Sequence, residues 1–441
     1  MPAHPADSAL YRGLFGDDET ARLFSDAAEI RAMLLVEGAL ARVQGALGLI
    51  PAEAAAAIDR AAREVQIDPA ALAAETAANG VPVPALVAAF RRAAGDAGAM
   101  EWAHWGATSQ DIMDTALALR LRPVLDLWES RLTALLGTFG ALAASHADLP
   151  MAARTYGQAA TPTTFGAVVA SWGRPLLRHR ADLGAVRRDV LIVSLSGAAG
   201  TLSAMGEGGP ACRAALAEAL GLADPGHSWH VERAGLAAFA AWMAATCATL
   251  GRMGEDLILL TQTGIGEVAV AGAGASSTMP QKANPVGPSA LVALARSAQG
   301  LAATMQGAML HRQQRDGAAW FTEWLTLPPL CMAAGRALSL GCDVAARIAP
   351  DPAAMARGLE AGGGTLMAEA LAFALARTMP RGEAAAAAGA LAREAAATGT
   401  PLRALAAAAH PALDWDTAVL GPFWLGTAPA EARAFAAAAS G

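Results

Sequence analysis

The chain has 441 residues, enough for several domains, and 54% of them are hydrophobic while only 5% are aromatic, because much of the apolar content is alanine. Alanine has the highest helix propensity, and no sustained alternation of Val, Ile or Thr is present, so the composition favours an all-α fold over one with a large sheet. The net charge of −7 comes without a basic stripe or tail, which argues against nucleic acid as a partner and leaves small anionic substrates possible.

Features of the whole sequence also bear on its location and cofactors. The four cysteines show no CxxC spacing and no pairing pattern: Cys212, Cys247, Cys331 and Cys342. Free thiols in a reducing cytoplasm are therefore expected, and the first residues lack the basic-then-apolar layout of a signal peptide. There is no zinc-ligand spacing, Walker sequence, HExxH motif or GxSxG elbow, so we expect neither a metal nor a cofactor.

Residues 1–108 are predicted to form an N-terminal domain of short helices. A serine or aspartate cap precedes a helix of about residues 30–47, whose apolar positions recur at spacings of three and four, so that one face is buried. Gly48 is placed to end this helix. Pro51 and Pro84 each stand at the start of a further helix.

A polar stretch, Trp102–Thr115, leads into the next helix. The hydroxyl and amide side chains of Thr108, Ser109 and Gln110 stand where that helix begins, so together with unpaired backbone N–H groups they can hold an anion. Two simpler interpretations remain open. In the first, Ser109 caps the helix and has no further role. In the second, His104 is a structural hydrogen-bonding residue, as lone histidines more often are, and not a catalytic one.

Residues 109–349 are predicted to form a central bundle of long helices, at about residues 111–146, 165–190, 234–263, 286–309 and 318–348. The uncharged run from Ala234 to Gly251 is long enough to span a membrane. Alanine dominates this run, however, and acidic residues follow in the same helix. We therefore expect a helix buried inside the bundle, and we expect no membrane partner. Residues 350–441 are predicted to form a smaller C-terminal helical domain.

Two further polar stretches carry candidate binding residues. The stretch 153–166 contains Arg154, Thr155, Tyr156 and Gln158, and the stretch 311–328 contains Arg315. The planar fork of an arginine can bind a carboxylate through two hydrogen bonds, which makes both arginines candidates. Surface or intersubunit salt bridges would explain the arginines equally well, and Tyr156 can equally be a packing residue.

The most informative stretch is the loop of residues 272–288, GAGASSTMPQKANPVGP. Glycines make its first half mobile, while prolines stiffen its second half and open the next helix. Its candidate residues are Ser276, Ser277, Met279, Lys282 and Asn284. Two hydroxyls, an amide and one positive charge suit the capture of a carboxylate next to a carbon that gains or loses a proton. The alternative is a solvated loop with incidental polar residues.

The pattern Ser-Ser-x-Met-Pro-x-Lys-x-Asn-Pro in this loop, together with His-x-Gly-x-Thr-Ser-x-Asp near residue 104, resembles the signatures of the fumarase/aspartase superfamily. The resemblance covers essentially the whole chain. It implies an all-α fold with a long central helical bundle and smaller helical N- and C-terminal domains. It also implies a homotetramer with active sites shared between subunits, and a small polycarboxylate substrate.

The resemblance assigns roles to individual residues. Ser276 would transfer the proton, while Lys282 and Asn284 would bind a substrate carboxylate, and His104 would orient the substrate. The remaining candidates would contact the substrate: Thr108, Ser109, Gln110, Arg154, Thr155, Tyr156, Gln158, Ser277, Met279 and Arg315. The chemistry implied in this way needs no cofactor.

The form His-Trp-Gly-Ala-Thr-Ser-Gln-Asp-Ile is most similar to the lactonizing branch of the superfamily, whose members cyclise a carboxylated muconate in protocatechuate breakdown. Members that eliminate amines carry Thr-His where this chain has Thr155-Tyr156. An amine must be protonated before it leaves, whereas a carboxylate leaves unassisted, so a lactonizing enzyme tolerates the missing histidine. The alternatives are a fumarate-releasing lyase of the adenylosuccinate or argininosuccinate lyase type, and a structural protein of the lens crystallin type.

Overall fold

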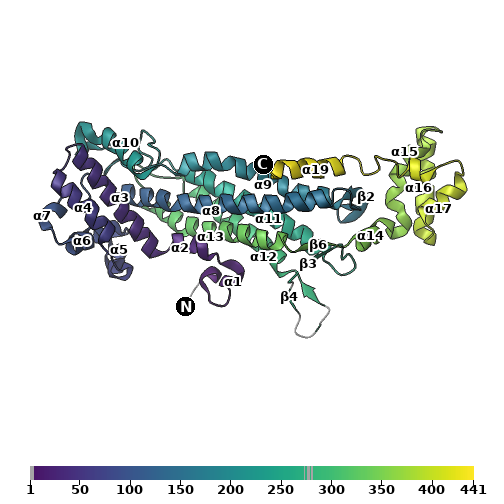
Figure 1. Cartoon of the computed structure of the whole chain (residues 1–441), viewed down its shortest axis with the longest axis horizontal. Coiled ribbons are helices and arrows are strands. Elements are labelled where there is room, and N and C mark those ends of the chain that lie inside the picture. Colours follow the sequence, from purple (N-terminus) through teal and green to yellow (C-terminus); the bar gives the residue numbers. More distant parts are fainter. Residues whose placement is uncertain (1–3, 273, 276–278, 280–281) are drawn as a thin grey trace. The chain divides into compact units, whose positions relative to one another are not determined.

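The computed structural model describes residues 4–272, 274–275, 279 and 282–441. Helices dominate this part of the chain, and its strands form only two-stranded sheets (Figure 1). The all-α class expected from the composition is confirmed. The chain divides into two compact units, Met1–Ser130 with Ala181–Ala248 and Leu294–Ser339, and Arg131–Arg180 with Thr249–Ala293 and Leu340–Gly441. The domain boundaries predicted from the sequence, near residues 108 and 349, stay predictions.

The first unit opens with short helices, as expected: α1 (Arg12–Phe15), α2 (Asp18–Leu23), α3 (Asp26–Ala46), α4 (Ala52–Glu64), α5 (Ala73–Asn79), α6 (Val83–Ala94) and α7 (Ala97–Met100). Ser25 caps α3 by accepting the N–H of Ala28, and Gly48 follows its end at φ +71°. Helices α3 and α4 pack very closely, since a Cβ on Gly45 would lie 2.3 Å from the Cβ of Ala55. The unit also contains α10 (Gly209–Leu220), which the sequence analysis did not identify.

The long helices of the described chain lie where they were predicted: α8 (Ser109–Ser145), α9 (Phe165–Val190), α11 (Ala234–Leu260), α12 (Val286–Gly307) and α13 (Gly317–Ala345). Each of them contributes residues to both units. Helices α8, α9 and α13 continue through internal prolines. Proline removes one backbone hydrogen bond, so these helices depend on tertiary packing to stay continuous.

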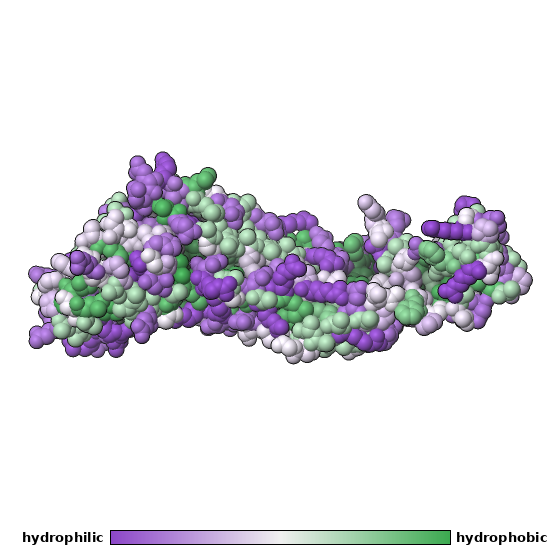
Figure 2. Space-filling view, turned by 90° about the horizontal axis from the view of Figure 1, so that it is seen from above, coloured by the Kyte–Doolittle hydropathy of each residue, from purple (hydrophilic) through white to green (hydrophobic). Residues whose placement is uncertain are grey.

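Helix α11 is long and apolar enough to cross a membrane by length and composition alone, and 61% of its most apolar window is buried within the protein. The expectation of a helix packed inside the bundle agrees with this burial. On the face drawn in Figure 2, hydrophilic and hydrophobic residues are interspersed. The four cysteines are free, and burial raises the pKa of Cys212 to about 11 and that of Cys247 to about 12.

A β-hairpin of the second unit was not predicted. Strands β1 (Pro150–Thr155) and β2 (Gln158–Thr164) pair antiparallel, with Thr155 opposite Gln158 across a two-residue turn. Tyr156 and Gly157 in this turn have φ values of +52° and +75°, as a type I′ turn requires. Two short pairs complete the described strands: β3 (Val268–Val270) with β6 (Ile348–Pro350), and β4 (Gly274–Ala275) with β5 (Ala283–Asn284).

The last part of the chain is helical, as expected: α14 (Pro352–Gly364), α15 (Ala368–Leu375), α16 (Arg381–Thr398), α17 (Leu402–Ala409), α18 (Trp415–Ala418) and α19 (Ala428–Ala439). Helix α14 loses helical geometry at Ala361–Gly363, and α16 begins after Pro380 and ends at Gly399. A local hydrophobic core holds α15, α16 and α17 together.

Candidate active site

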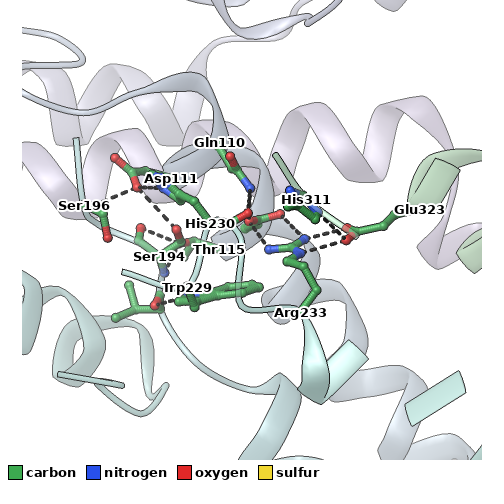
Figure 3. A network of polar contacts seen from close by, with 12 residues as sticks. Gln110, Asp111, Thr115, Ser194, Ser196, Trp229, His230, Arg233, His311 and Glu323 are labelled. Carbon is green, nitrogen blue, oxygen red and sulfur yellow. Dashed lines mark hydrogen bonds and ion pairs between the residues drawn. The ribbon is translucent and has the colours of Figure 1, made fainter. Parts of the chain in front are cut away.

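Asp111, in the first turn of α8, anchors this end of the helix to a loop far away in sequence. Its side chain is fully buried and accepts the backbone N–H groups of Ser196 and Gly197, each at 2.9 Å. It also accepts the Nε2–H of His230 at 2.8 Å (Figure 3). The N–H of Thr108 donates to the same carboxylate at 3.0 Å. One carboxylate therefore fixes the start of α8 against the loop of residues 194–197.

Three of the predicted site residues lie around this anchored loop. Thr108 directly precedes α8 and Ser109 is its first residue, at the end of the helix where backbone N–H groups point outward. Arg315 donates from Nη2 to the carbonyl of Ala198 at 3.1 Å. The structure thus brings Thr108, Ser109 and Arg315 to one place, with a helix N-terminus and a guanidinium that both favour an anion.

Gln110 lies in the same turn, but its side chain points into the protein. It is completely buried, and its Nε2 donates to Asp114 at 3.2 Å and to the carbonyl of His230 at 2.9 Å. The amide nitrogen expected to bind substrate is therefore already used inside the first unit.

His104 was predicted to orient the substrate, and its partner is Glu37 of α3. Its Nδ1 lies 2.6 Å from Glu37 Oε1, and the imidazole is 21% exposed while the carboxylate is only 1% exposed. Burial alone would lower the pKa of His104, but the charge of Glu37 and its hydrogen bond outweigh this effect, so the pKa is raised. The histidine is thereby held closer to its cationic form.

A buried ion cluster next to these residues escaped the sequence analysis. Arg233 donates to Asp114 at 2.7 and 3.1 Å and to Glu323 at 2.8 and 2.6 Å. Its guanidinium lies 4.5 Å from the centre of the Trp229 ring. Burial lowers the pKa of Arg233, but the two carboxylates outweigh this, so the pKa is raised, while burial raises the pKa of Glu323. A usable signal in the sequence is Glu323, which is the single charge between Gly317 and Gly335 in α13.

In the second unit, Arg154 is paired with Glu267. Both of its terminal nitrogens donate to Glu267, at 2.7 and 2.9 Å, and the Glu267 side chain is 1% exposed. The hydrogen bond to Glu267 dominates in raising the pKa of Arg154. Thr155, Tyr156 and Gln158 are exposed around the hairpin turn.

The candidate loop is described only in part. Lys282 is exposed, and its backbone N–H donates to the carbonyl of Met279 at 3.0 Å. Asn284 is half-buried in β5. Ser276 and Ser277 lie outside the described residues. Within the described residues, no group of three His, Cys, Asp or Glu side chains is placed to hold a metal ion.

The N-terminus of α8 and the nearby guanidinium of Arg315 suit an enzyme that acts on small anions. Residues 6–300 match the profile of a protein family described as Lyase, and the chain belongs to this family. This match and the relatives described next confirm the family resemblance and the enzyme class that were predicted from the sequence.

Two named relatives and one solved structure are similar to the chain over most of its length. The chain is 43% identical over 364 residues to the 3-carboxy-cis,cis-muconate cycloisomerase of Pseudomonas aeruginosa, covering 81% of this chain and 79% of the relative. It is 36% identical over 416 residues to a nitrosuccinate lyase of Streptomyces davaonensis, covering 91% and 88%. The crystal structure of the 3-carboxy-cis,cis-muconate lactonizing enzyme from Pseudomonas putida superposes with a TM-score of 0.92 at 34% identity, covering 98% of this chain and 99% of that one.

Proposed function

We propose that the chain catalyses the reversible cycloisomerization of 3-carboxy-cis,cis-muconate to 4-carboxymuconolactone, a step of protocatechuate breakdown. The observation that carries this proposal is the 43% identity to a cycloisomerase over about four fifths of both chains. The Tyr156 that stands in place of a histidine supports it, because a carboxylate leaving group needs no acid.

The reaction adds one proton to the ionised substrate and transfers no other group. One substrate carboxylate oxygen forms a bond to a carbon of the double bond conjugated with a second carboxylate. The π electrons move onto that second carboxylate, and the carbon next to it then gains a proton. The reverse reaction removes the proton and expels the first carboxylate. The enzyme must therefore stabilise negative charge on the second carboxylate and move one proton.

The candidate residues match these two demands. A substrate with three carboxylates needs several positive partners, and the N-terminus of the 37-residue helix α8, Arg315 and the imidazole of His104 supply them in the first unit. Lys282 and Asn284 would stabilise the carboxylate that collects charge. Ser276 would transfer the proton, and because a serine hydroxyl is a weak acid it needs a neighbouring ammonium group such as that of Lys282.

The same proposal includes a homotetramer in the cytoplasm whose active sites are shared between subunits. Tyr156 is fully exposed in the single chain and Lys282 is also exposed, as expected for residues that complete a site only beside a partner chain. The free cysteines agree with a reducing compartment.

The decisive experiment follows the loss of ultraviolet absorbance as the conjugated diene of 3-carboxy-cis,cis-muconate cyclises, with Ser276→Ala as the control. Rapid loss with the wild type and a loss of rate of at least about a hundredfold in the variant would support the proposal. Because a nitrosuccinate lyase is also similar, fumarate release from nitrosuccinate, adenylosuccinate and argininosuccinate is measured in parallel. Turnover of one of these with no reaction of the muconate would replace the proposal with a fumarate-releasing lyase.

A further inference from the structure

Glu37 stands out in the first unit because its carboxylate is buried and only one of its two oxygens has a hydrogen-bond partner among the described residues. Oε1 lies 2.6 Å from Nδ1 of His104, whereas Oε2 has no hydrogen-bond partner among the residues that the structure describes. Burying a carboxylate costs several kcal/mol, so a singly bonded one is retained only where the surrounding fold compensates for that cost.

The backbone around His104 is also unusual. His104 has φ +64°, in the left-handed region, which costs a residue other than glycine about 1 kcal/mol or more. The carbonyls on both sides of it are held: Arg91 donates to Ala103 at 2.9 Å, and Gln44 donates to Trp105 at 2.7 Å. The strained conformation is therefore fixed from two sides rather than adopted by chance.

Two partners of this segment, Glu37 and Gln44, lie on one face of α3. Glu37 and Gln44 are seven residues apart on α3, which places them two turns apart on the same face. One contacts the side chain of His104 and the other contacts the backbone of the residue after it. Because α3 contacts the turn around His104 through two buried polar side chains, it fixes the position of that turn.

We propose that Glu37 is the positioning residue of His104, holding the imidazole at Nδ1 as a cation so that Nε2–H is left to bind a carboxylate of the substrate. This inference rests on the proposed function, since it assumes a polyanionic substrate. The charged groups that act on His104 come from three helices: Glu37 of α3 and Asp111 of α8 raise its pKa, and Arg91 of α6 lowers it. Of these, only Glu37 is hydrogen-bonded to the imidazole ring.

The variant Glu37→Gln tests the proposal, because the amide oxygen can still accept Nδ1–H while the negative charge is gone. His104 should then lose its proton at lower pH. At pH 8 the KM for 3-carboxy-cis,cis-muconate should rise about tenfold, because lowering a pKa by one unit reduces the protonated fraction up to about tenfold. Near pH 5.5 the KM should approach the wild-type value, and kcat should change much less than KM. Glu37→Asp keeps the charge and should restore the wild-type pH at which KM begins to rise. Glu53→Gln, an exposed glutamate on α4, is the matched control and should change nothing.

If Glu37→Gln changes kcat and KM by the same factor at every pH, Glu37 is only a structural residue and the proposal is wrong. A second readout does not need the substrate. The chain has eight histidines, so in protein labelled with ¹³C at histidine Cε1 the His104 signal can be assigned by its loss in His104→Gln. A lower titration midpoint of this signal in Glu37→Gln supports the proposal, and an unchanged midpoint overturns it. Failure of the wild type to cyclise the muconate would overturn the proposed function instead, and the titration would still decide the role of Glu37.

Discussion

Asp111 and His230 form a hydrogen bond of 2.8 Å in which both side chains are almost completely buried, although they are 119 residues apart in the sequence. Because a carboxylate oxygen only accepts, Nε2 of His230 carries a hydrogen, and Nδ1 has no partner among the described residues. The same carboxylate also accepts from Ser194 Oγ at 3.3 Å and from three backbone N–H groups. Five donors therefore point at this carboxylate, and an amide with one acceptor oxygen and an NH₂ group could not accept from all of them.

The first prediction concerns Asp111. In Asp111→Asn, an NH₂ group must face at least one of the N–H donors, so we expect a loss of about 3 kcal/mol in the free energy of unfolding. The loop next to Thr108 should loosen, and kcat/KM should fall about tenfold or more. Urea denaturation and steady-state kinetics measure the two effects. Asp126→Asn changes an exposed aspartate on the same helix and should cost under about 0.5 kcal/mol; equal losses in the two variants would contradict the prediction.

The sequence and the structure agree where the controlling interactions are local. The five long helices follow from apolar spacing, and the end of α3 follows from Ser25 and Gly48, because caps act within a few residues. The hairpin β1–β2 was missed because its residues, with alanines, threonines and Pro162, show no alternation of apolar and polar side chains.

The same reasoning explains which site residues the sequence could identify. Thr108 and Ser109 are recognisable because a helix begins there. The partners of the charged residues are not, because Arg154 pairs with a glutamate 113 residues further on and Arg233 with an aspartate 119 residues earlier. From the sequence Arg154 is predicted to be a substrate ligand, and its pairing with Glu267 could not be foreseen. No periodicity within the sequence encodes such distant pairs.

The second prediction concerns the buried cluster. Arg233→Met leaves Asp114 and Glu323 as two buried carboxylates without their cation, and we expect a loss of about 3–5 kcal/mol at pH 8. Removing the cation raises the pKa of both carboxyls in the folded protein above their unfolded values. The folded variant therefore binds more protons, and its stability rises as pH falls toward 5. Urea midpoints at pH 5 and pH 8 test this.

A stability deficit of Arg233→Met that is equal at the two pH values would contradict this explanation. Arg12→Met is the control, since Arg12 forms an exposed ion pair with Asp18 at 2.5 Å and its loss should be small at both pH values.

The third prediction is a double-mutant cycle on Arg154 and Glu267. Two parallel hydrogen bonds join an exposed hairpin to a buried carboxylate, so Arg154→Met, Glu267→Gln and the double variant should give a coupling of about 2 kcal/mol in unfolding free energy. If Arg154 supports the hairpin, neither single variant should bind substrate more tightly than the wild type. A lower KM in Glu267→Gln would instead mean that Arg154 is a substrate ligand restrained by Glu267.

The fourth prediction tests why Tyr156 stands where amine-eliminating relatives carry histidine. The side chain is fully exposed at φ +52°, a conformation that histidine also tolerates, so Tyr156→His should change the unfolding free energy by less than about 0.5 kcal/mol. A new acid gives no help to a carboxylate leaving group, and the predicted contact of the phenol with the substrate is lost, so lactonization should slow about tenfold. Lactonization is measured as kcat/KM with 3-carboxy-cis,cis-muconate, and amine elimination is measured as kcat/KM with adenylosuccinate. Tyr156→Phe separates loss of the hydroxyl from loss of the ring. Unchanged lactonization in Tyr156→His, together with efficient amine elimination by the wild type, would refute the leaving-group argument.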